Sequence, residues 1–254
     1  MEYFKDLEFD LPSALLAQLV DLFERMTPGP LNEETVLEVP EEQGVYQLFF
    51  NGELVYVGKT DADAGLRQRL LRHAKKIRSR RNLHQSQVTF KAVRVYVFTA
   101  MDLEDLLIKH YRGSGISLAW NLSGFGSNDP GRKRDKSHIK QGHFDRLFPI
   151  DLNFEVRVVQ PMDDHSVAEV LRQLKAQLAY TVRFQNKGAN SKKPHSDLEG
   201  TMVRLRSEKD SVLNALRQVK AALGGAWQIT ALPGYVIIYR ERERYPQGEV
   251  IQAG

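Results

Sequence analysis

The stretch Gly44-Val-Tyr-Gln-Leu-Phe-Phe-Asn-Gly-Glu-Leu-Val-Tyr-Val-Gly-Lys59 decides how the first half of the chain is expected to fold. Its centre, Asn51-Gly52, separates two runs rich in β-branched and aromatic residues. Asn-Gly in that setting is the strongest short signal for a β-hairpin. We therefore predict two antiparallel strands, over 44–49 and 53–58.

The register of this hairpin fixes where its two tyrosines point. A two-residue loop would send Tyr46 and Tyr56 to opposite faces, because side chains alternate along a strand. A three-residue loop, Phe50-Asn51-Gly52 with Gly52 left-handed, would place them opposite each other on one face. Joint chemistry by the tyrosines requires a shared face, so the three-residue loop is our prediction, although Asn-Gly statistics favour the shorter one.

Periodicity outward from the hairpin predicts a mixed α+β chain with a small antiparallel three-stranded sheet flanked by helices. The third strand is expected over 88–99, and helices over 11–26, 65–78 and 102–111. A second α+β part follows, with strands over 153–160, 202–205, 227–232 and 235–240 and helices over 166–180 and 207–223. No internal repeat is evident. We predict an acidic helical arm (1–43), a first domain (44–150) and a C-terminal domain of unknown role (151–254).

Composition excludes several classes of protein. Hydrophobic residues make up 42% of the 254, enough for a core, and there is no cysteine for a disulfide, a thiolate nucleophile or a cysteine-based zinc finger. No apolar run approaches the roughly 20 residues that cross a bilayer. The acidic N-terminus lacks the pattern of a signal peptide. These features predict a cytoplasmic protein that does not associate with a membrane.

Charge is unevenly distributed along the chain. Residues 1–43 carry eleven acids against Lys5 and Arg25, a net charge of −9, so the remainder carries +13 of the total of +4. Between Lys59 and Arg81 nine bases accompany two acids. Such a concentrated positive field is typical of a polyanion site, and a solvated basic helix is the alternative.

Three polar residues are expected beside apolar helix faces. At 100° per residue, His73 shares a face with Leu66, Leu70 and Ile77, and Arg69 lies on its edge. Glu104 lies similarly beside the apolar face of the helix over 102–111. Two of them have an ordinary explanation: His73 as a hydrogen-bonded core histidine, and Glu104 as a carboxylate favoured at a helix N-terminus. Placing all three near apolar surface costs desolvation unless they have partners, which favours a common site.

These motifs together resemble the GIY-YIG nuclease superfamily. Gly44-Val-Tyr46 and Tyr56-Val-Gly58 resemble its two named strands, and Arg69-Leu-Leu-Arg-His73 resembles its first helix. Glu104 and Trp120-Asn121 resemble its metal-binding glutamate and late asparagine. Trp120-Asn-Leu-Ser-Gly-Phe-Gly-Ser-Asn-Asp-Pro-Gly-Arg-Lys-Arg-Asp135 looks like the signature of its small type II restriction endonucleases. The resemblance covers about residues 28–150 and leaves 151–254 without an inherited role.

The resemblance implies site-specific cleavage of double-stranded DNA with one divalent metal, Mg²⁺, which Mn²⁺ would replace. Glu104 would bind the metal, Arg69 the scissile phosphate, and Tyr56 a phosphoryl oxygen or the attacking water. The proton of that water would go to Tyr46, the family's usual general base, or to His73; the residues leave this open. Asn121 completes the implied catalytic set, orienting a neighbour or a phosphate.

DNA contacts are expected to extend from this site. Along the basic helix the candidates are Lys59, Arg72, Lys76, Arg80 and Arg81, which would follow the phosphate backbone and make binding salt-dependent. The loop 127–136 adds Asn128, Arg132, Lys133 and Arg134, which suit either base readout or phosphate anchoring. The basic stretch 183–195 is a second clamp or a flexible linker.

One motif set per chain implies a homodimer on a palindromic site, within a restriction-modification or phage-defence system that allows a cognate DNA methyltransferase. The alternative is a non-cleaving DNA-binding module on the same scaffold. A third reading is an RNA- or protein-interaction domain with accidental motifs. The intact set Tyr46, Tyr56, Arg69, His73 and Glu104 argues against pure binding, because binding alone does not need a glutamate near the phosphates.

Overall fold

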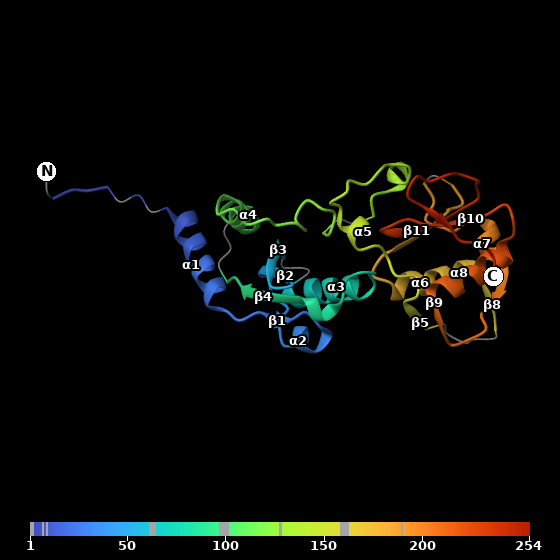
Figure 1. Cartoon of the computed structure of the whole chain (residues 1–254), viewed down its shortest axis with the longest axis horizontal. Helices are drawn as coiled ribbons and strands as arrows, with labels where there is room; N and C mark the ends of the chain where they lie inside the picture. The colour runs from blue at the N-terminus through green and yellow to red at the C-terminus, as the bar shows by residue number, and fades with distance from the viewer. Residues whose placement is uncertain are drawn as a thin grey trace. The chain divides into compact units, whose positions relative to one another are not determined.

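The computed structural model describes residues 3–6, 8, 10–60, 65–96, 102–126, 129–157, 163–188 and 190–254. The chain is α+β, as predicted, with helices in both halves (Figure 1). The first half has an antiparallel sheet, and the second has a mixed sheet, in which β7 and β11 are parallel, with two antiparallel ribbons. It divides into two compact units. Unit 1 comprises 1–74 and 85–122, and unit 2 comprises 75–84 and 123–254. No helix within these described ranges is long and apolar enough to cross a bilayer.

Unit 1 is organised around a sheet with strand order β1-β4-β2-β3, in which all neighbouring strands are antiparallel. Three strands of seven residues dominate it: β2 (Gly44–Phe50), β3 (Glu53–Lys59) and β4 (Val88–Arg94). The sequence predicts three strands, and the structure adds a fourth, the two-residue β1 (Gly29–Pro30). Beyond residue 96, the predicted end of β4 lies outside the described residues.

The β2–β3 hairpin corrects the predicted loop. Phe50 pairs with Glu53, so the loop is the two-residue Asn51-Gly52, with φ of 51° and 84° as a type I′ turn requires. A β-bulge then follows, because Phe49 pairs with Leu54 but Leu48 pairs with Tyr56. With the two-residue loop alone, Tyr46 and Tyr56 would lie on opposite faces. The extra residue, Val55, shifts the alternation by one and returns them to the same face. Tyr46 pairs with Gly58, so both tyrosines face the same side of the sheet by a different route from the predicted one.

Helices cover both faces of this sheet. α3 (Leu66–Arg78) lies on the face that carries Tyr46, with Leu66, Leu70, His73 and Ile77 buried as the periodicity predicts. The opposite face contacts α1 (Leu11–Arg25) and α4 (Leu103–Gly113) through Val45 and Val57. A short α2 (Glu33–Leu37) precedes β2.

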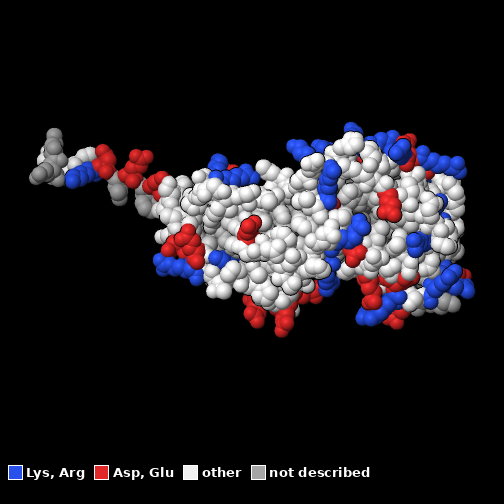
Figure 2. All heavy atoms as spheres, viewed as in Figure 1, with Lys and Arg blue, Asp and Glu red and all other residues white. Residues whose placement is uncertain are grey.

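Acidic side chains gather on the N-terminal arm in the space-filling view (Figure 2).

Unit 2 has a second sheet with strand order β12-β10-β11-β7 and two separate two-stranded ribbons. Its strands are β5 (Glu155–Arg157), β6 (Asp164–Ser166), β7 (Thr181–Phe184), β8 (Met202–Arg204), β9 (Lys209–Ser211), β10 (Gln228–Ala231), β11 (Tyr235–Tyr239) and β12 (Glu249–Val250). Its helices are α5 (Phe144–Leu147), α6 (Val167–Gln177), α7 (Ser196–Gly200) and α8 (Val212–Leu223). Residues 158–160 of the first predicted strand lie outside the described residues.

An internal repeat, which the sequence analysis did not identify, organises unit 2. β5-β6-α6-β7 and β8-β9-α8-β10 run in the same order, and the first strand of each copy pairs with the second strand of the other. The registers match, because Glu155 pairs with Ser211 and Met202 with Ser166. Equivalent positions hold identical residues at Ser166/Ser211, Val167/Val212, Leu171/Leu216, Arg172/Arg217, Gln173/Gln218, Lys175/Lys220, Ala176/Ala221 and Leu178/Leu223.

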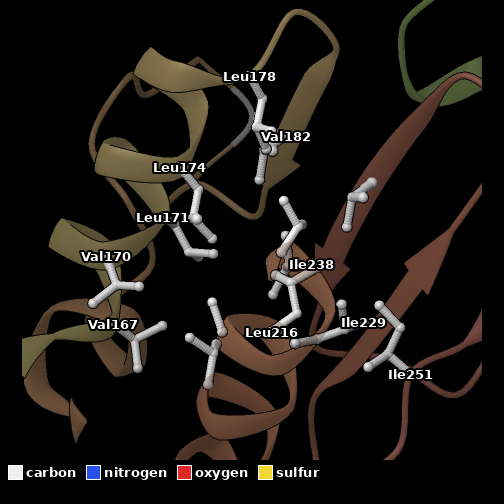
Figure 3. Packing of buried hydrophobic residues seen from close by; sticks show 14 of the residues in the cluster. Val167, Val170, Leu171, Leu174, Leu178, Val182, Leu216, Ile229, Ile238 and Ile251 are labelled. Atoms are coloured by element: carbon white, nitrogen blue, oxygen red, sulfur yellow. The ribbon is translucent and has the colours of Figure 1, made fainter. Parts of the chain in front are cut away.

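This repeat also corrects one helix boundary. The sequence predicts a helix from 207, but 209–211 form β9 and α8 begins at Val212. Ser211 is its N-cap and accepts a hydrogen bond from the backbone N–H of Asn214, as Ser166 does from Glu169 for α6. Between the sheet and the helices lies one large apolar core, in which side chains of α6 and α8 meet those of β7, β10 and β11 (Figure 3).

The two compact units do not divide at residue 150, the boundary predicted between the first and the C-terminal domain. Residues 123–150 belong to unit 2, because Ser123 accepts a hydrogen bond from the N–H of Phe144 and Ile150 donates one to Pro233. Lys75–His84 join them. The loop-rich segment therefore folds with the C-terminal part.

Candidate active site

Three ring side chains of unit 1 meet on one face of the sheet. The Tyr46 hydroxyl is hydrogen-bonded to Nε2 of His73 at 2.8 Å, and ring centroids of Tyr46, Tyr56 and His73 lie 5.5 to 6.0 Å apart. A hydrogen bond also joins the two tyrosine hydroxyls. Tyr46 and His73 are buried, whereas Tyr56 is half-buried. The arrangement is a hydrogen-bonded chain from the partly exposed Tyr56 through Tyr46 to His73.

Two glycines of the hairpin motifs make room for these rings. A Cβ on Gly58 would lie 2.5 Å from the hydroxyl oxygen and Cζ of Tyr46 and 2.8 Å from the Tyr56 ring. At Gly44 it would lie 2.1 Å from the carbonyl oxygen of Val93. All of these distances are shorter than Cβ atoms show in proteins. Gly58 therefore leaves room for the phenol of Tyr46 to lie across β3. Gly44 allows β2 to pair closely with β4.

Burial determines the ionisation of the two tyrosines. It is the main cause that raises the pKa of Tyr46 well above its usual value of 10.0, and Arg69 lowers it only in part. The pKa of Tyr56 is raised too, first by burial and then by the charge of Glu104. The positive charge of Arg69 therefore does not make Tyr46 a phenolate, and the hydroxyl keeps its proton at neutral pH.

Arg69 and Glu104 provide opposite charges beside the rings. Both are half-buried, and each acts electrostatically on both tyrosines. The Nε of Arg69 is buried without a hydrogen-bond partner among the described residues. Burial, followed by the charge of Asp102, raises the pKa of Glu104. No hydrogen bond or ion pair of the Glu104 carboxylate is found in the described part of the chain. A buried donor and a half-buried carboxylate are thus left open for a ligand.

Asp102, which the sequence analysis did not single out, positions Glu104. Its carboxylate accepts a hydrogen bond from the N–H of Asp105 and so caps α4. The same carboxylate forms an ion pair with Lys59 at the end of β3, N to O 2.7 Å. The pair ties the start of α4 to the strand that carries Tyr56. The N-cap pattern Asp-x-x-Asp before the helix is the signal that could have identified it.

Asn121 acts on the backbone of β3. Its side-chain amide accepts a hydrogen bond from the N–H of Val57 at 2.9 Å and donates one to the Val57 carbonyl at 2.8 Å. The N–H of Trp120 donates to the carbonyl of Val55, the bulge residue. Asn121 therefore occupies the place of a neighbouring strand at the free edge of the sheet. Of the two roles expected for it, this geometry supports orienting a neighbour.

The predicted DNA-binding residues around α3 divide by exposure. Arg72 and Arg81 are exposed, and Lys59 is exposed but paired with Asp102. Arg80 is a correction: it is only 5% exposed, and its guanidinium forms an ion pair with Asp145 at 2.8 Å. It also donates to the carbonyls of Phe148 and Pro233. Arg80 holds unit 2 together and is not available to a phosphate.

Lys76 is sequestered in a similar way. Its Nζ donates to the carbonyl of Phe125 and lies 5.2 Å and 5.4 Å from the ring centroids of Phe125 and Phe144. Burial is the main cause that lowers its pKa to about 8. An amine enclosed in this way is not free for DNA, and the expected contact is not supported.

The loop candidates also separate. Arg132 forms an ion pair with Glu241 at 3.2 Å and stacks on the Tyr239 ring, whereas Lys133 and Arg134 are exposed without an ion pair among the described residues. Asn128 lies outside the described residues. Basic and acidic side chains are interspersed on the face of unit 2 drawn in Figure 2. In the basic stretch 183–195, Arg183 is enclosed by acidic and aromatic side chains.

Within the described ranges, no group of three or more histidine, aspartate and glutamate side chains is placed to hold a metal. A metal there would have to rely on Glu104, waters and substrate. No family model matches the chain, and no curated protein matches it in sequence.

Proposed function

We propose that the chain is a Mg²⁺-dependent endonuclease acting on double-stranded DNA, with a GIY-YIG-like nuclease fold in unit 1. The observation that carries the proposal is the grouping of three rings with two opposite charges, since Arg69 and Glu104 both act electrostatically on Tyr46 and Tyr56. The hydrogen-bonded Tyr56–Tyr46–His73 chain adjoins a guanidinium with an orphaned N–H and an unpaired carboxylate. A structural cluster would satisfy these charged groups internally.

Hydrolysis of a phosphodiester requires acceptance of a proton from the attacking water and stabilisation of negative charge on the phosphoryl oxygens. The first requirement fits the ring chain. Tyr46 keeps its proton because burial raises its pKa, so it can accept a proton only as it passes its own to His73. Imidazole titrates in the range that such a transfer needs. We assign His73 as the final proton acceptor, Tyr46 as the relay and Tyr56 as the group that orders the water.

The second requirement fits Arg69. A guanidinium presents a planar fork that matches two phosphoryl oxygens. Its buried Nε lacks a partner among the described residues, and a phosphoryl oxygen would supply one. The positive charge of Arg69 lowers the pKa of Tyr46 and Tyr56 and so partly offsets the effect of burial when the proton is transferred.

Glu104 fits a divalent cation. Its carboxylate is unpaired in the described part of the chain. Burial, followed by the charge of Asp102, raises its pKa and so disfavours the ionised form, which a bound cation would stabilise. Mg²⁺ is commonly held by one or two carboxylates, with waters and substrate phosphate completing its shell, and Mn²⁺ would replace it. When bound, the ion supplies charge stabilisation to the phosphoryl oxygens.

The exposed cations of α3 would bind the phosphate backbone. Arg72, Lys75 and Arg78 are exposed on this helix, and Arg81 follows it. Contacts of this kind make affinity fall with salt. We further propose that the chain acts as a homodimer on a palindromic site, in a restriction or phage-defence system with a DNA methyltransferase.

The test is cleavage of several duplex DNAs with Mg²⁺, with mapping of the product ends. The proposal expects discrete fragments from the wild type and none from Glu104→Gln. DNA that is bound tightly but never cut by a folded wild type would overturn it in favour of the non-cleaving module.

A further inference from the structure

A polar cluster in unit 2 lies outside the candidate active site. Asp135 is 3% exposed, and its carboxylate accepts hydrogen bonds from Arg183 at 2.8 and 3.0 Å. It also accepts hydrogen bonds from the hydroxyls of Tyr235 at 2.8 Å and Tyr239 at 3.4 Å. A carboxylate this deeply buried is stable only with several donors, and here it has three side chains.

Arg183 of β7 holds both ends of one loop. The same guanidinium that binds Asp135 also binds Asp129, through its Nη2 at 2.8 Å and its Nε at 3.1 Å. One side chain thus bridges two carboxylates six positions apart in the sequence. Its planar fork suits this double pairing, which a lysine cannot reproduce.

The loop between the two aspartates has a defined shape. The N–H of Gly131 donates to Oδ1 of Asp129, and Gly131 adopts a φ of 79° that favours glycine. Arg132–Arg134 then form one turn of 3₁₀ helix. Two cations of the loop are already engaged in ion pairs: Arg132 pairs with Glu241, and Lys136 pairs with Glu243 at 2.8 Å.

Two cations remain at the tip. Lys133 and Arg134 are exposed, and neither has an ion pair among the described residues. The loop is therefore fixed at its base and cationic at its tip. This arrangement is suited to an anionic partner with a regular surface, because a loop that is ordered beforehand loses less conformational entropy on binding.

We propose that Arg183 is a positioning residue for DNA recognition, which holds the loop 129–136 so that Lys133 and Arg134 meet the duplex in a fixed geometry. This inference rests on the proposed function, and it gives the C-terminal part a role: β7 and β11 anchor the loop. Loss of the clamp leaves the tip charges in place but frees their positions. Sequence discrimination should then fall more than non-specific attraction, because counterion release depends on charge whereas base readout depends on geometry.

The experiment uses the full chain and Arg183→Lys, which keeps the charge and loses the fork. Arg204→Lys is the matched control, because Arg204 forms an exposed ion pair with Asp164 in the same unit. The probes are a duplex taken from a mapped wild-type cleavage position and a scrambled duplex of equal length, with Ca²⁺ replacing Mg²⁺ so that binding is measured without cleavage. For Arg183→Lys we expect the ratio of the two affinities to fall at least tenfold with an unchanged salt slope, and for the control no change.

A second measurement keeps the inference falsifiable if Arg183→Lys unfolds. Lys133→Gln with Arg134→Gln changes only exposed side chains and should lower the same ratio while also reducing the salt slope. An unaltered ratio in this double variant, or in a folded Arg183→Lys, overturns the inference alone. A wild type that binds neither duplex overturns the proposed function and the inference with it.

Discussion

The hydroxyl of Tyr46 lies 2.8 Å from Nε2 of His73, and both side chains are withdrawn from solvent. Burial raises the pKa of Tyr46 well above 10.0, so a free phenolate at this position is unfavourable. A buried phenol bonded to an imidazole can still move a proton when it gives one up as it receives one. The contact therefore shifts the expected chemistry from a tyrosine base to a tyrosine–histidine relay.

Replacing Tyr46 by phenylalanine tests this relay. The ring still fills its place beside Gly58, but the link to His73 is lost. We expect single-turnover cleavage to fall by about 10²–10⁴-fold, the usual contribution of a positioned acid–base group. DNA affinity should not change, and thermal unfolding should show a cost of about 1 kcal/mol for the lost hydrogen bond.

Tyr111→Phe is the matched control. The Tyr111 hydroxyl accepts a hydrogen bond from Gln47 at 2.7 Å, and its ring packs on the opposite face of the sheet. Its loss should cost similar stability and leave cleavage unchanged. Equal loss of cleavage in both variants would mean that Tyr46 acts through stability and not through proton transfer.

Glu104→Gln should separate activity from stability. The pKa of Glu104 is raised in the folded chain, so its stabilising contribution is present below the unfolded pKa and is lost as pH rises through the folded value. At pH 7 the ionised carboxylate therefore opposes folding, and glutamine should raise the unfolding temperature. Cleavage should fall by more than about 100-fold, in line with losses seen on removing groups that support metals or transition-state charge.

The response to Mg²⁺ provides the check. A cation that binds only the folded chain raises its unfolding temperature. The wild type should show this rise and Glu104→Gln should not. Asp105→Asn, one position further along α4 and paired with Lys109, should keep it. A similar rise in all three proteins would place the metal elsewhere.

The hairpin shows how far sequence reasoning reaches in this fold. The strands, the helix face with His73 and the edge position of Arg69 all follow from short-range periodicity. The predicted loop length was wrong. An extra loop residue was expected to bring the two tyrosines to one face, whereas the extra residue is Val55, in a bulge within β3. A bulge leaves no distinctive residue here, since valine suits a regular strand equally well.

Long-range partners explain the other differences. Arg80 lies in a run of basic residues, and only the fold brings Asp145 to it from 65 positions away. The strand of residues 209–211 forms because β5 lies beside it, although local periodicity favours a longer helix. The repeat escaped notice because its copies differ in the spacing of their first two strands and in their third strands.

Arg72 and Arg80 should respond in opposite ways to the same substitution. Arg80→Gln removes the buried partner of the half-buried Asp145, and breaking a buried ion pair in this way typically costs about 3–5 kcal/mol. Arg72→Gln changes an exposed side chain and should leave stability within about 0.5 kcal/mol. Its effect should appear in DNA binding, where the slope of log affinity against log salt falls by about 0.9 for one lost phosphate contact. Urea unfolding and a salt titration separate the two, and an unaltered slope for Arg72→Gln would remove it from the DNA surface.

Lys76 should make stability depend on pH in the alkaline range. Burial is the main cause that lowers its pKa to about 8, whereas an unfolded lysine has a pKa of about 10.4. Between these values the unfolded chain binds the proton and the folded chain does not, so folding is favoured as pH rises. Lys76→Met removes this group, and the wild type should gain free energy of unfolding relative to it from pH 8 to 10. Lys75→Met, an exposed neighbour, should follow the wild type. Parallel curves for the wild type and Lys76→Met would show that the aromatic rings and the Phe125 carbonyl stabilise the ammonium enough to offset its burial.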